Sequence, residues 1–517
     1  MSRADLHADR RTRELEGLRD GPALDLLVVG GGITGAGVAL DAAARGLRVA
    51  LVERRDLAWG TSRWSSKLIH GGLRYLAQGA VGIALESARE RGVLLGRTAP
   101  HLVRPIPQLI PLTEDVDAGV ARETRIGLAL GDVLRRAAGT PARELPRSRR
   151  VGPAEAERLA PGVRRAGLRG GLVSWDAQVE DDARLVVTVA RTAAAHGASV
   201  LTRCAALELA GDGARLRDEL SGETFDVRAR AVVNATGVWA GELAGDVRLR
   251  PSRGTHVVIP LERLGGLAGT LNVPVPGEHG RWVFAVAQRS GVAYVGLTDE
   301  AAPGPIPDVP EPPEADIAFL LETLSPALAT PLTRDDVVGA FAGLRPLVDD
   351  PDAPARTADL SRRHAVVHHP GGPISVVGGK LTTYRRMAED AVDAAVAAAG
   401  LNDAGRCRTR GIPLVGAVPR AELATIEAPR RLVDRHGAGA PAVVALAGGD
   451  PELLAPVAAG LDVLGVEVLH AVRAEGALDA DDVLDRRTRI GLVPADRERA
   501  LPAVEALVAA GRQASPA

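Results

Sequence analysis

Three glycines near the start of the chain, Gly30, Gly32 and Gly35, have the spacing of a loop that binds a dinucleotide. Residues 24–45 read as an apolar strand, this glycine turn and then a helix of small residues. In such a turn the backbone approaches a pyrophosphate closely, and the first N–H groups of the helix face the phosphates. Glu53 ends the next apolar run, at the position where a carboxylate can bind ribose hydroxyls.

Two further glycine turns follow predicted strands later in the chain. The first is Ala235-Thr236-Gly237, and the second includes Gly379 and Lys380 and precedes a predicted helix. A helix N-terminus at this second turn can face a flavin ring and stabilise the negative charge that develops on reduction. Three strand-to-glycine turns are more than a nicotinamide domain needs, so the pattern favours FAD.

Four segments occur in one order along the chain: residues 29–46 (VGGGITGAGVALDAAARG), 65–76 (SSKLIHGGLRYL), 343–347 (GLRPL) and 378–388 (GGKLTTYRRMA). Together they resemble the motifs of FAD-dependent glycerol-3-phosphate dehydrogenases of the aerobic type. The resemblance runs from about residue 24 to residue 399 and continues weakly beyond. Departures such as Val238 and Leu297 stand beside the motifs, and they put fine specificity in doubt rather than the reaction.

The resemblance implies that sn-glycerol 3-phosphate is oxidised to dihydroxyacetone phosphate, with a hydride passing to FAD and electrons then passing to a membrane quinone. One alternative is a related flavin oxidase that acts on this or another small anion and uses oxygen as the acceptor. A second is a binding protein on a flavoprotein scaffold, which should lack flavin and the set His256, Arg345 and Lys380.

Site residues follow from the motifs and from chemistry. A phosphate monoester is best held by arginine, which offers paired planar donors, and a secondary alcohol needs a base for its proton. We expect His256, Arg345 and Lys380 to be catalytic, and His70, Arg74, Tyr75 and Arg345 to bind the substrate. The expected cofactor contacts are Gly30, Gly32, Ile33, Thr34, Gly35, Glu53, Thr61, Ser62, Ser65, Ser66, Lys67, Ala235, Thr236, Gly237, Gly379, Lys380, Leu381 and Thr382.

Composition limits the partners. The net charge is −2 and aromatic residues make up 2%, which argues against a nucleic-acid surface. Lys67 and Lys380 are the only lysines, which suggests a need for a compact ammonium at both positions. The histidines at 364, 368 and 369 precede a Pro-Gly-Gly-Pro turn, which favours a hairpin over a metal site. We expect a cytoplasmic chain that is peripheral on the inner face of the membrane if it reduces quinone, and a homodimer is a further expectation.

The predicted fold class is α/β, with a Rossmann-like FAD-binding domain, an antiparallel-sheet substrate domain and a helical C-terminal domain. The expected parts are a polar tail (1–23), a discontinuous FAD domain (24–102, 170–246 and 339–400), a connecting region (103–169), a substrate domain (247–338) and a C-terminal domain (401–517).

Overall fold

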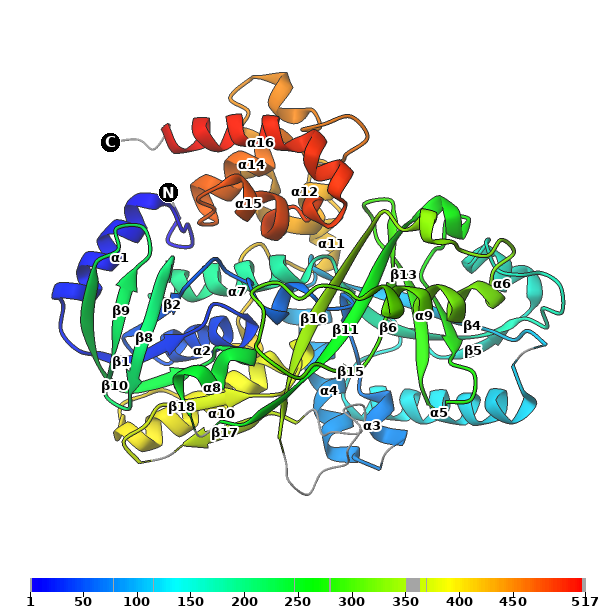
Figure 1. Ribbon diagram of the computed structural model, residues 1–517, viewed down its shortest axis with the longest axis horizontal. Coiled ribbons are helices and arrows are strands. Elements are labelled where there is room, and N and C mark those ends of the chain that lie inside the picture. Colours follow the sequence, from blue (N-terminus) through cyan, green and yellow to red (C-terminus); the bar gives the residue numbers. More distant parts are fainter. Residues whose placement is uncertain are drawn as a thin grey trace.

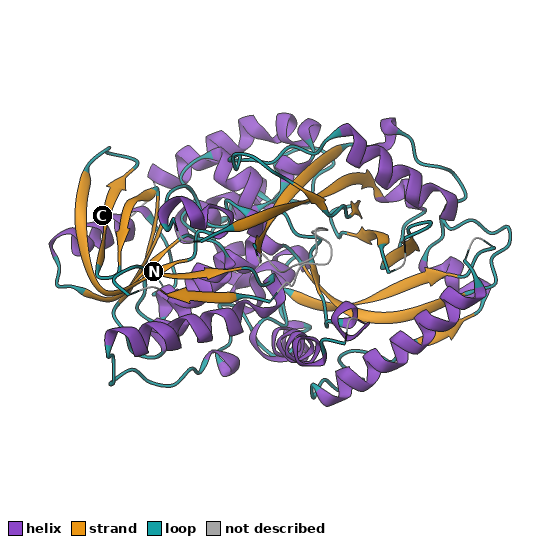
Figure 2. Ribbon diagram, turned by 60° about the horizontal axis from the view of Figure 1, so that its bottom comes forward, coloured by secondary structure: helices purple, strands orange, loops and turns teal. Residues whose placement is uncertain are grey.

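The computed structural model describes residues 2–77, 79–114, 116–245, 247–278, 280–349, 363–368 and 370–513. It contains two β-sheets with helices packed on them, and a helical C-terminal part that lies above both sheets in the view of Figure 1. In Figure 2 the strands of the first sheet lie to the left and those of the second to the right. The predicted α/β fold class is confirmed.

The first sheet has the strand order β17-β18-β10-β1-β2-β7, and β1 pairs in parallel with both β10 and β2. Its strands are β1 (Leu24–Val29), β2 (Val49–Glu53), β7 (Ser199–Thr202), β10 (Thr224–Asn234), β17 (Ala365–His368) and β18 (Ile374–Val377), with β8 (Cys204–Ala210) and β9 (Gly213–Asp218) extending the sheet from β10. The strands are apolar because helices cover them. The carboxyl ends of β1, β2, β10 and β18 meet at one edge, where ligands of such sheets bind.

Helix α2 (Ile33–Ala44) follows the first glycine turn and packs against α7 (Asp182–Ala195) and α10 (Tyr384–Ala399). Its small residues are buried, which allows close approach. A Cβ atom at Gly37 would lie 2.9 Å from the Tyr384 ring, so glycine is needed where α2 meets α10. This packing fixes the direction of α2, and therefore the direction in which its N-terminal N–H groups point.

The second sheet has the order β15-β11-β14-β13-β12-β4-β6-β3, with β16 beside β11 and β5 beside β6. Its strands are β3 (Leu68–Ile69), β4 (Val103–Pro111), β5 (Arg149–Val151), β6 (Gly171–Val179), β11 (Leu249–Pro260), β12 (Thr270–Pro274), β13 (Trp282–Ala287), β14 (Val292–Gly296), β15 (Glu300–Ala301) and β16 (Gly339–Val348).

The second sheet thus differs from the predicted substrate domain (247–338), because it includes strands expected in the connecting region and in the FAD domain. β16 shows the physical reason: it pairs with β11 along its whole length, from Val348 opposite Leu249 to Gly339 opposite Val258. Because β16 is hydrogen-bonded to β11 over its whole length, it belongs to the second sheet, although the sequence placed it in the FAD domain.

The remaining helices lie outside the two sheets. They are α3 (Leu73–Ala77), α4 (Val81–Val93), α5 (Ala118–Ala137), α6 (Pro153–Leu159), α8 (Ala240–Leu243) and α9 (Glu314–Leu324), then α11 (Arg420–Leu423), α12 (Arg430–His436), α13 (Ala440–Ala445), α14 (Gly465–Ala474), α15 (Ala480–Asp482) and α16 (Pro494–Gln513) of the C-terminal part. No helix in the described ranges has the length and apolarity that a membrane crossing requires. The predicted polar tail forms α1 (Ala8–Asp20), which buries Leu18 and pairs Arg11 with Asp218 at 2.5 Å.

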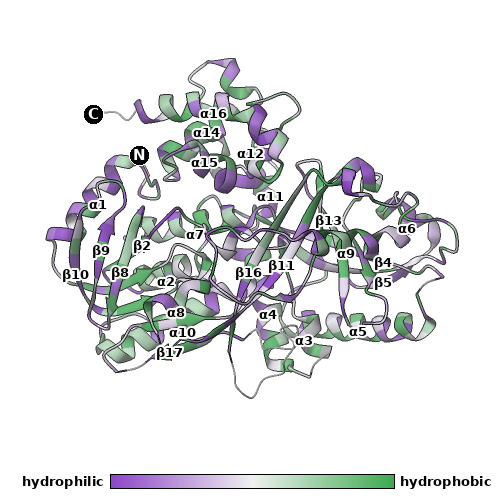
Figure 3. Ribbon diagram, viewed as in Figure 1, coloured by the Kyte–Doolittle hydropathy of each residue, from purple (hydrophilic) through white to green (hydrophobic). Residues whose placement is uncertain are grey.

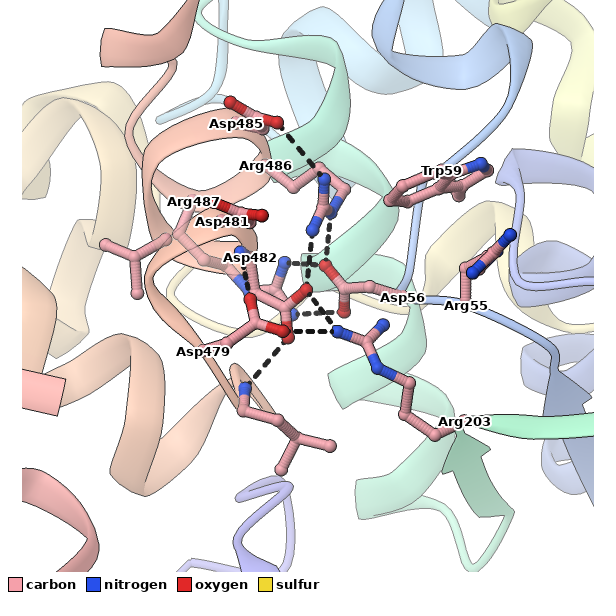
Figure 4. Close-up of polar contacts among 12 residues, drawn as sticks. Arg55, Asp56, Trp59, Arg203, Asp479, Asp481, Asp482, Asp485, Arg486 and Arg487 are labelled. Atoms are coloured by element: carbon pink, nitrogen blue, oxygen red, sulfur yellow. Dashed lines mark hydrogen bonds and ion pairs between the residues drawn. The ribbon is translucent and has the colours of Figure 1, made fainter. Parts of the chain in front are cut away.

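A buried group of ion pairs joins the C-terminal part to the loop after β2 (Figure 4). The Asp56 carboxylate accepts hydrogen bonds from Arg486 Nε at 2.6 Å and from both terminal nitrogens of Arg487 at 2.8 Å. Asp56 and Arg486 are fully buried. The two guanidinium groups hold the pKa of Asp56 at about 2 although burial alone would raise it.

Replacing Asp56 by Asn should therefore destabilise the fold, because the buried Arg487 guanidinium loses its carboxylate partner and the buried Arg486 guanidinium keeps only Asp482 and Asp485. We expect a loss of roughly 3–5 kcal/mol in the free energy of unfolding. Asp308→Asn is the matched control: Asp308 pairs with Arg54 and Arg55 at the surface, where such pairs contribute about 0–1 kcal/mol. Denaturant unfolding measures both, and equal losses would contradict the account.

Candidate active site

A cavity of ≈ 370 Å³ opens where the carboxyl ends of the parallel strands face the second sheet. The first sheet contributes the glycine turns after β1, β10 and β18, and the second contributes His256 on β11 and Arg345 on β16. The predicted residues that line this cavity are Gly30, Gly32, Ile33, Thr34, Glu53, Thr61, Ser62, Ser65, Ser66, His70, Ala235, Thr236, Gly237, His256, Arg345, Gly379, Lys380, Leu381 and Thr382. The fold therefore brings together residues that are far apart in the sequence.

The first glycine turn has the geometry of a tight crossing between β1 and α2. Gly30 has a φ of 112°, and a Cβ atom there would lie 2.6 Å from the Ala235 carbonyl oxygen. Gly35 does not line the cavity, and its Cβ would lie only 1.9 Å from the Gly30 carbonyl oxygen. Gly32 caps α2, and the Ser62 hydroxyl accepts a hydrogen bond from Ile33 N at 2.9 Å.

Glu53 lies at the end of β2, beside this turn. Its carboxylate accepts hydrogen bonds from Gly31 N at 2.6 Å and Arg55 N at 2.7 Å. Burial raises the pKa of Glu53, and the two backbone N–H groups oppose that rise. The carboxylate is therefore held in one orientation at the cavity wall.

His256 projects from β11 into the opposite wall and is 2% exposed. Its Nε2 atom lies 2.8 Å from the Ser66 hydroxyl, and its ring stacks on Phe341 with centroids 4.8 Å apart. Burial lowers the pKa of His256 well below its ordinary value, and the positive charges of Lys67 and Arg345 lower it further. The imidazole is consequently neutral at physiological pH and can accept a proton.

Lys67, predicted as a cofactor contact, lies behind the cavity wall rather than in it. Its ammonium donates hydrogen bonds to the carbonyl oxygens of Arg63 and Ser65, both at 3.1 Å, and to Asp182 at 2.8 Å. Burial lowers the pKa of Lys67 to about 8. The side chain therefore fixes the segment that carries Ser65 and Ser66.

Arg345 reaches the cavity from β16 with its guanidinium group already oriented. It donates to the Ser252 hydroxyl at 3.1 Å, to Asp299 at 3.2 Å and to the Thr298 carbonyl oxygen at 3.1 Å. A Cβ atom at Gly254 would lie 2.2 Å from its Nη2 atom, so the glycine makes room for the guanidinium.

The other predicted substrate residues lie near the third glycine turn and β3. The Lys380 ammonium lies 3.8 Å from the centroid of the Tyr75 ring; Tyr75 itself does not line the cavity. His70 lines it, with Nδ1 3.1 Å from Asp176 Oδ2, and the other oxygen of that carboxylate accepts a hydrogen bond from Arg91. The side chain of Arg74 falls outside the described part of the chain.

Neither group of histidines supports a metal site in the part of the chain that is described. His364 Nε2 lies 2.8 Å from Asp390, His368 is exposed on β17, and His369 is outside the described residues. His436, His470 and Glu475 also come together, but the Glu475 carboxylate is already paired with Arg184 and Arg191. That cluster is a buried ion-pair network.

Comparisons with known proteins agree with this geometry. A family model for FAD-dependent oxidoreductases matches residues 25–385, and a model for the C-terminal domain of alpha-glycerophosphate oxidase matches residues 407–516. The chain is 55% identical over 501 residues to glycerol-3-phosphate dehydrogenase 1 of Mycobacterium tuberculosis, covering 96% of this chain and 97% of that protein. The chain belongs to the FAD-dependent glycerol-3-phosphate dehydrogenase family.

More distant relatives extend the likeness. The mitochondrial glycerol-3-phosphate dehydrogenase of Arabidopsis thaliana is 35% identical, covering 94% of this chain and 82% of that protein. The crystal structure of glycerol-3-phosphate dehydrogenase from Bacillus halodurans complexed with FAD has a TM-score of 0.73 and 27% identity, covering 98% of this chain and 94% of that one. The FAD-bound L-alpha-glycerophosphate oxidase of Mycoplasma pneumoniae (TM-score 0.56, 18% identity, 77% of this chain and 100% of that one) shares the fold.

The cavity of this family member fits FAD by two observations. A Cβ atom at Gly32 would meet only the Ser62 hydroxyl among the described residues, at 3.2 Å, so the backbone at the start of α2 is open to the cavity. In addition, three buried nitrogens of the lining, Trp59 Nε1, Trp64 Nε1 and His256 Nδ1, have no hydrogen-bond partner within the described residues. The tryptophans were not predicted as site residues.

Gly32→Val should abolish FAD binding in this family member, because the new side chain would stand at the N-terminus of α2, facing Ser62. Gly17→Val on α1 is the control, since a Cβ atom there meets nothing within 4 Å. The ratio of flavin absorbance to protein absorbance in the purified variants checks this. Full FAD content in Gly32→Val would remove the turn from the cofactor site.

Proposed function

We propose that this chain oxidises sn-glycerol 3-phosphate to dihydroxyacetone phosphate. The observation that carries the proposal is the shared cavity, in which His256 and Arg345 face the three glycine turns. Its relatives are named for the same activity. When bound, FAD accepts the hydride that leaves carbon 2 of the substrate.

The glycine turns and Glu53 would hold the cofactor. The N–H groups of Gly32, Ile33 and Thr34 at the start of α2 would face the pyrophosphate, and Glu53 would accept hydrogen bonds from a ribose. The turn at Gly379 and Lys380 would lie against the flavin ring, where an ammonium stabilises developing negative charge.

His256 would accept the proton of the substrate hydroxyl. The Ser66 hydroxyl lies in the same wall and is hydrogen-bonded to Nε2, so the proton can reach Nε2 through Ser66 while carbon 2 loses its hydride. Phe341 and the buried environment keep the ring fixed and neutral. Arg345 would hold the negative charge of the substrate, at the phosphate or at the reacting oxygen.

We infer that the electrons then pass to a membrane quinone and that the chain is peripheral on the inner face of the membrane. The support is the resemblance to family members, together with the finding that no described helix could span a membrane. Hydrogen peroxide formed in air at the rate of substrate oxidation would instead identify oxygen as the acceptor. A homodimer stays a prediction.

The low pKa of His256 sets the expected pH dependence of flavin reduction. As pH falls through that pKa the ring gains a proton and can no longer accept one, so the wild-type rate should hold well below pH 6.5 and then fall. His256→Gln should slow reduction on the order of a hundredfold or more and remove this acid limb. Stopped-flow bleaching of FAD-loaded enzyme measures both, with the exposed His368→Gln as control. A wild-type profile in His256→Gln would exclude it as the base.

Arg345→Lys keeps the charge but loses the planar pair of donors. If Arg345 stabilises charge that develops on the reacting oxygen, turnover should fall on the order of a hundredfold while KM also rises. A rise in KM with unchanged turnover would instead show uniform binding of the phosphate. Steady-state kinetics distinguish the two outcomes, with the surface substitution Arg334→Lys as control.

A further inference from the structure

Arg63 is an arginine that is almost fully buried, at 1% exposed, and yet makes only weak contact with a carboxylate. Its Nε atom donates a hydrogen bond to the Trp59 carbonyl oxygen at 2.9 Å, and its Nη1 atom lies 3.7 Å from Asp485. Within the described part of the chain its terminal nitrogens donate no hydrogen bond. A buried charge in this state costs free energy unless another negative group comes near it.

The neighbouring arginines of the C-terminal part are paired more closely. Arg486 and Arg487 share the Asp56 carboxylate, which raises the pKa of both against the cost of burial. Burial, together with the positive charges of Arg486 and Arg489, instead lowers the pKa of Arg63 to about 9. Arg63 therefore keeps its charge at neutral pH without the compensation that Arg486 and Arg487 have.

Two tryptophan rings of the active-site cavity lie against Arg63. Its Cζ atom is 4.8 Å from the centroid of the Trp59 ring and 4.2 Å from that of the Trp64 ring. Both tryptophans line the cavity, whereas Arg63 does not. The negative face of an indole ring attracts a guanidinium group, which helps to hold the charge in this place. This part of the wall therefore consists of two indole rings with a positive charge behind them.

The C-terminal part adds a second guanidinium group to each ring. Arg486 lies over the Trp59 ring at 4.9 Å, as Figure 4 shows, and Arg489 lies over the Trp64 ring at 5.2 Å. Both come from the segment after α15, which is hydrophilic and coloured purple in Figure 3 where it faces the sheets. We call Trp59, Arg63, Trp64, Arg486 and Arg489 the arginine–tryptophan stack.

Trp64 places this stack beside the reacting groups of the cavity. Its ring stacks on Phe341 with centroids 5.8 Å apart, and Phe341 in turn stacks on His256. A Cβ atom at Gly343 would lie 2.6 Å from the Trp64 Cβ, so Trp64 packs directly on β16, the strand that carries Arg345. The stack therefore adjoins the wall that His256 and Arg345 form.

We propose that Arg63, held behind Trp59 and Trp64, stabilises the reduced flavin and so raises the reduction potential of FAD in this chain. A hydride brings negative charge to the flavin ring, and a fixed positive charge nearby favours that state in a site with little water. The indole rings lie between this charge and the cavity, so Arg63 acts through space rather than by a hydrogen bond. The proposal deepens the proposed function and rests on it for the position of the flavin ring.

The alternative target of the charge is the pyrophosphate of FAD. The pyrophosphate carries the same charge in both redox states of the cofactor. A positive charge that acted only there would strengthen FAD binding and leave the reduction potential unchanged. The potential and the dissociation constant of FAD therefore distinguish the two roles.

Anaerobic equilibration of the FAD-loaded protein with a reference dye of known potential tests the proposal without glycerol 3-phosphate. Arg63→Met removes the charge and keeps a long side chain. At a fixed poise it should lower the ratio of reduced to oxidised flavin roughly tenfold, about 30 mV for a two-electron couple. Asp485→Asn should shift the ratio in the opposite direction, because it removes a negative charge beside Arg63. We expect a rise of only about threefold, or about 15 mV, because the Asp485 side chain is 30% exposed.

Arg135→Met is the matched control. Arg135 is 6% exposed, donates to the Thr140 carbonyl oxygen and lies 3.7 Å from Asp132, but it belongs to α5 and does not line the cavity. Its replacement should leave the potential unchanged.

Three results would overturn the proposal: a wild-type potential in Arg63→Met, weaker FAD binding at an unchanged potential, or shifts of the same sign in Arg63→Met and Asp485→Asn. If Arg63→Met does not fold, the absence of a rise in the partly exposed Asp485→Asn variant would overturn it as well. Because the dye replaces the substrate, a failure of glycerol 3-phosphate to reduce the wild-type flavin would count against the proposed function and not against the role of Arg63.

Discussion

The buried ion pairs of the Asp56 carboxylate with Arg486 and Arg487 join the C-terminal part to the loop after β2. A buried carboxylate is tolerated only with such partners, so the loop after β2 and the C-terminal segment must fold against each other. The same C-terminal segment also contacts the cavity wall. Arg489 donates a hydrogen bond to the Arg63 carbonyl oxygen at 2.7 Å, and that oxygen also accepts a hydrogen bond from Lys67. Lys67 in turn fixes the residues beside His256. The C-terminal part therefore supports the cavity wall that carries Ser66 and His256.

The two sheets divide the chemistry between them. The parallel sheet presents the backbone N–H groups of its glycine turns, which suit phosphates, together with the Glu53 carboxylate and the Lys380 ammonium at its edge. The second sheet presents His256 and Arg345, and the surroundings of these two side chains favour different charge states. His256 is buried against Phe341 and loses its charge, whereas Arg345 keeps its charge beside Asp299. One cavity can thus accept a proton and hold an anion at the same pH.

The sequence predicted those elements whose residues lie close together along the chain. The strand, glycine turn and helix around Gly30 and Gly32 lie within one short stretch, and Glu53 follows at a regular distance. Long-range features could not be predicted, because pairing of β16 with β11, or of Asp56 with Arg487, leaves no periodicity in either segment. Lys67 is an example: the scarcity of lysine in the chain singled it out as a cofactor contact, but only the fold shows that its side chain lies behind the cavity wall.

The central claim is that glycerol 3-phosphate gives its hydride to the cofactor in the cavity shared by the glycine turns, His256 and Arg345. The most direct measurement is the absorbance of the FAD-loaded protein after anaerobic mixing with sn-glycerol 3-phosphate. The account predicts that the oxidised flavin bleaches and that dihydroxyacetone phosphate forms in equal amount, whereas glycerol 2-phosphate leaves the spectrum unchanged. A flavin that stays oxidised with glycerol 3-phosphate, in protein carrying its full FAD content, would contradict it.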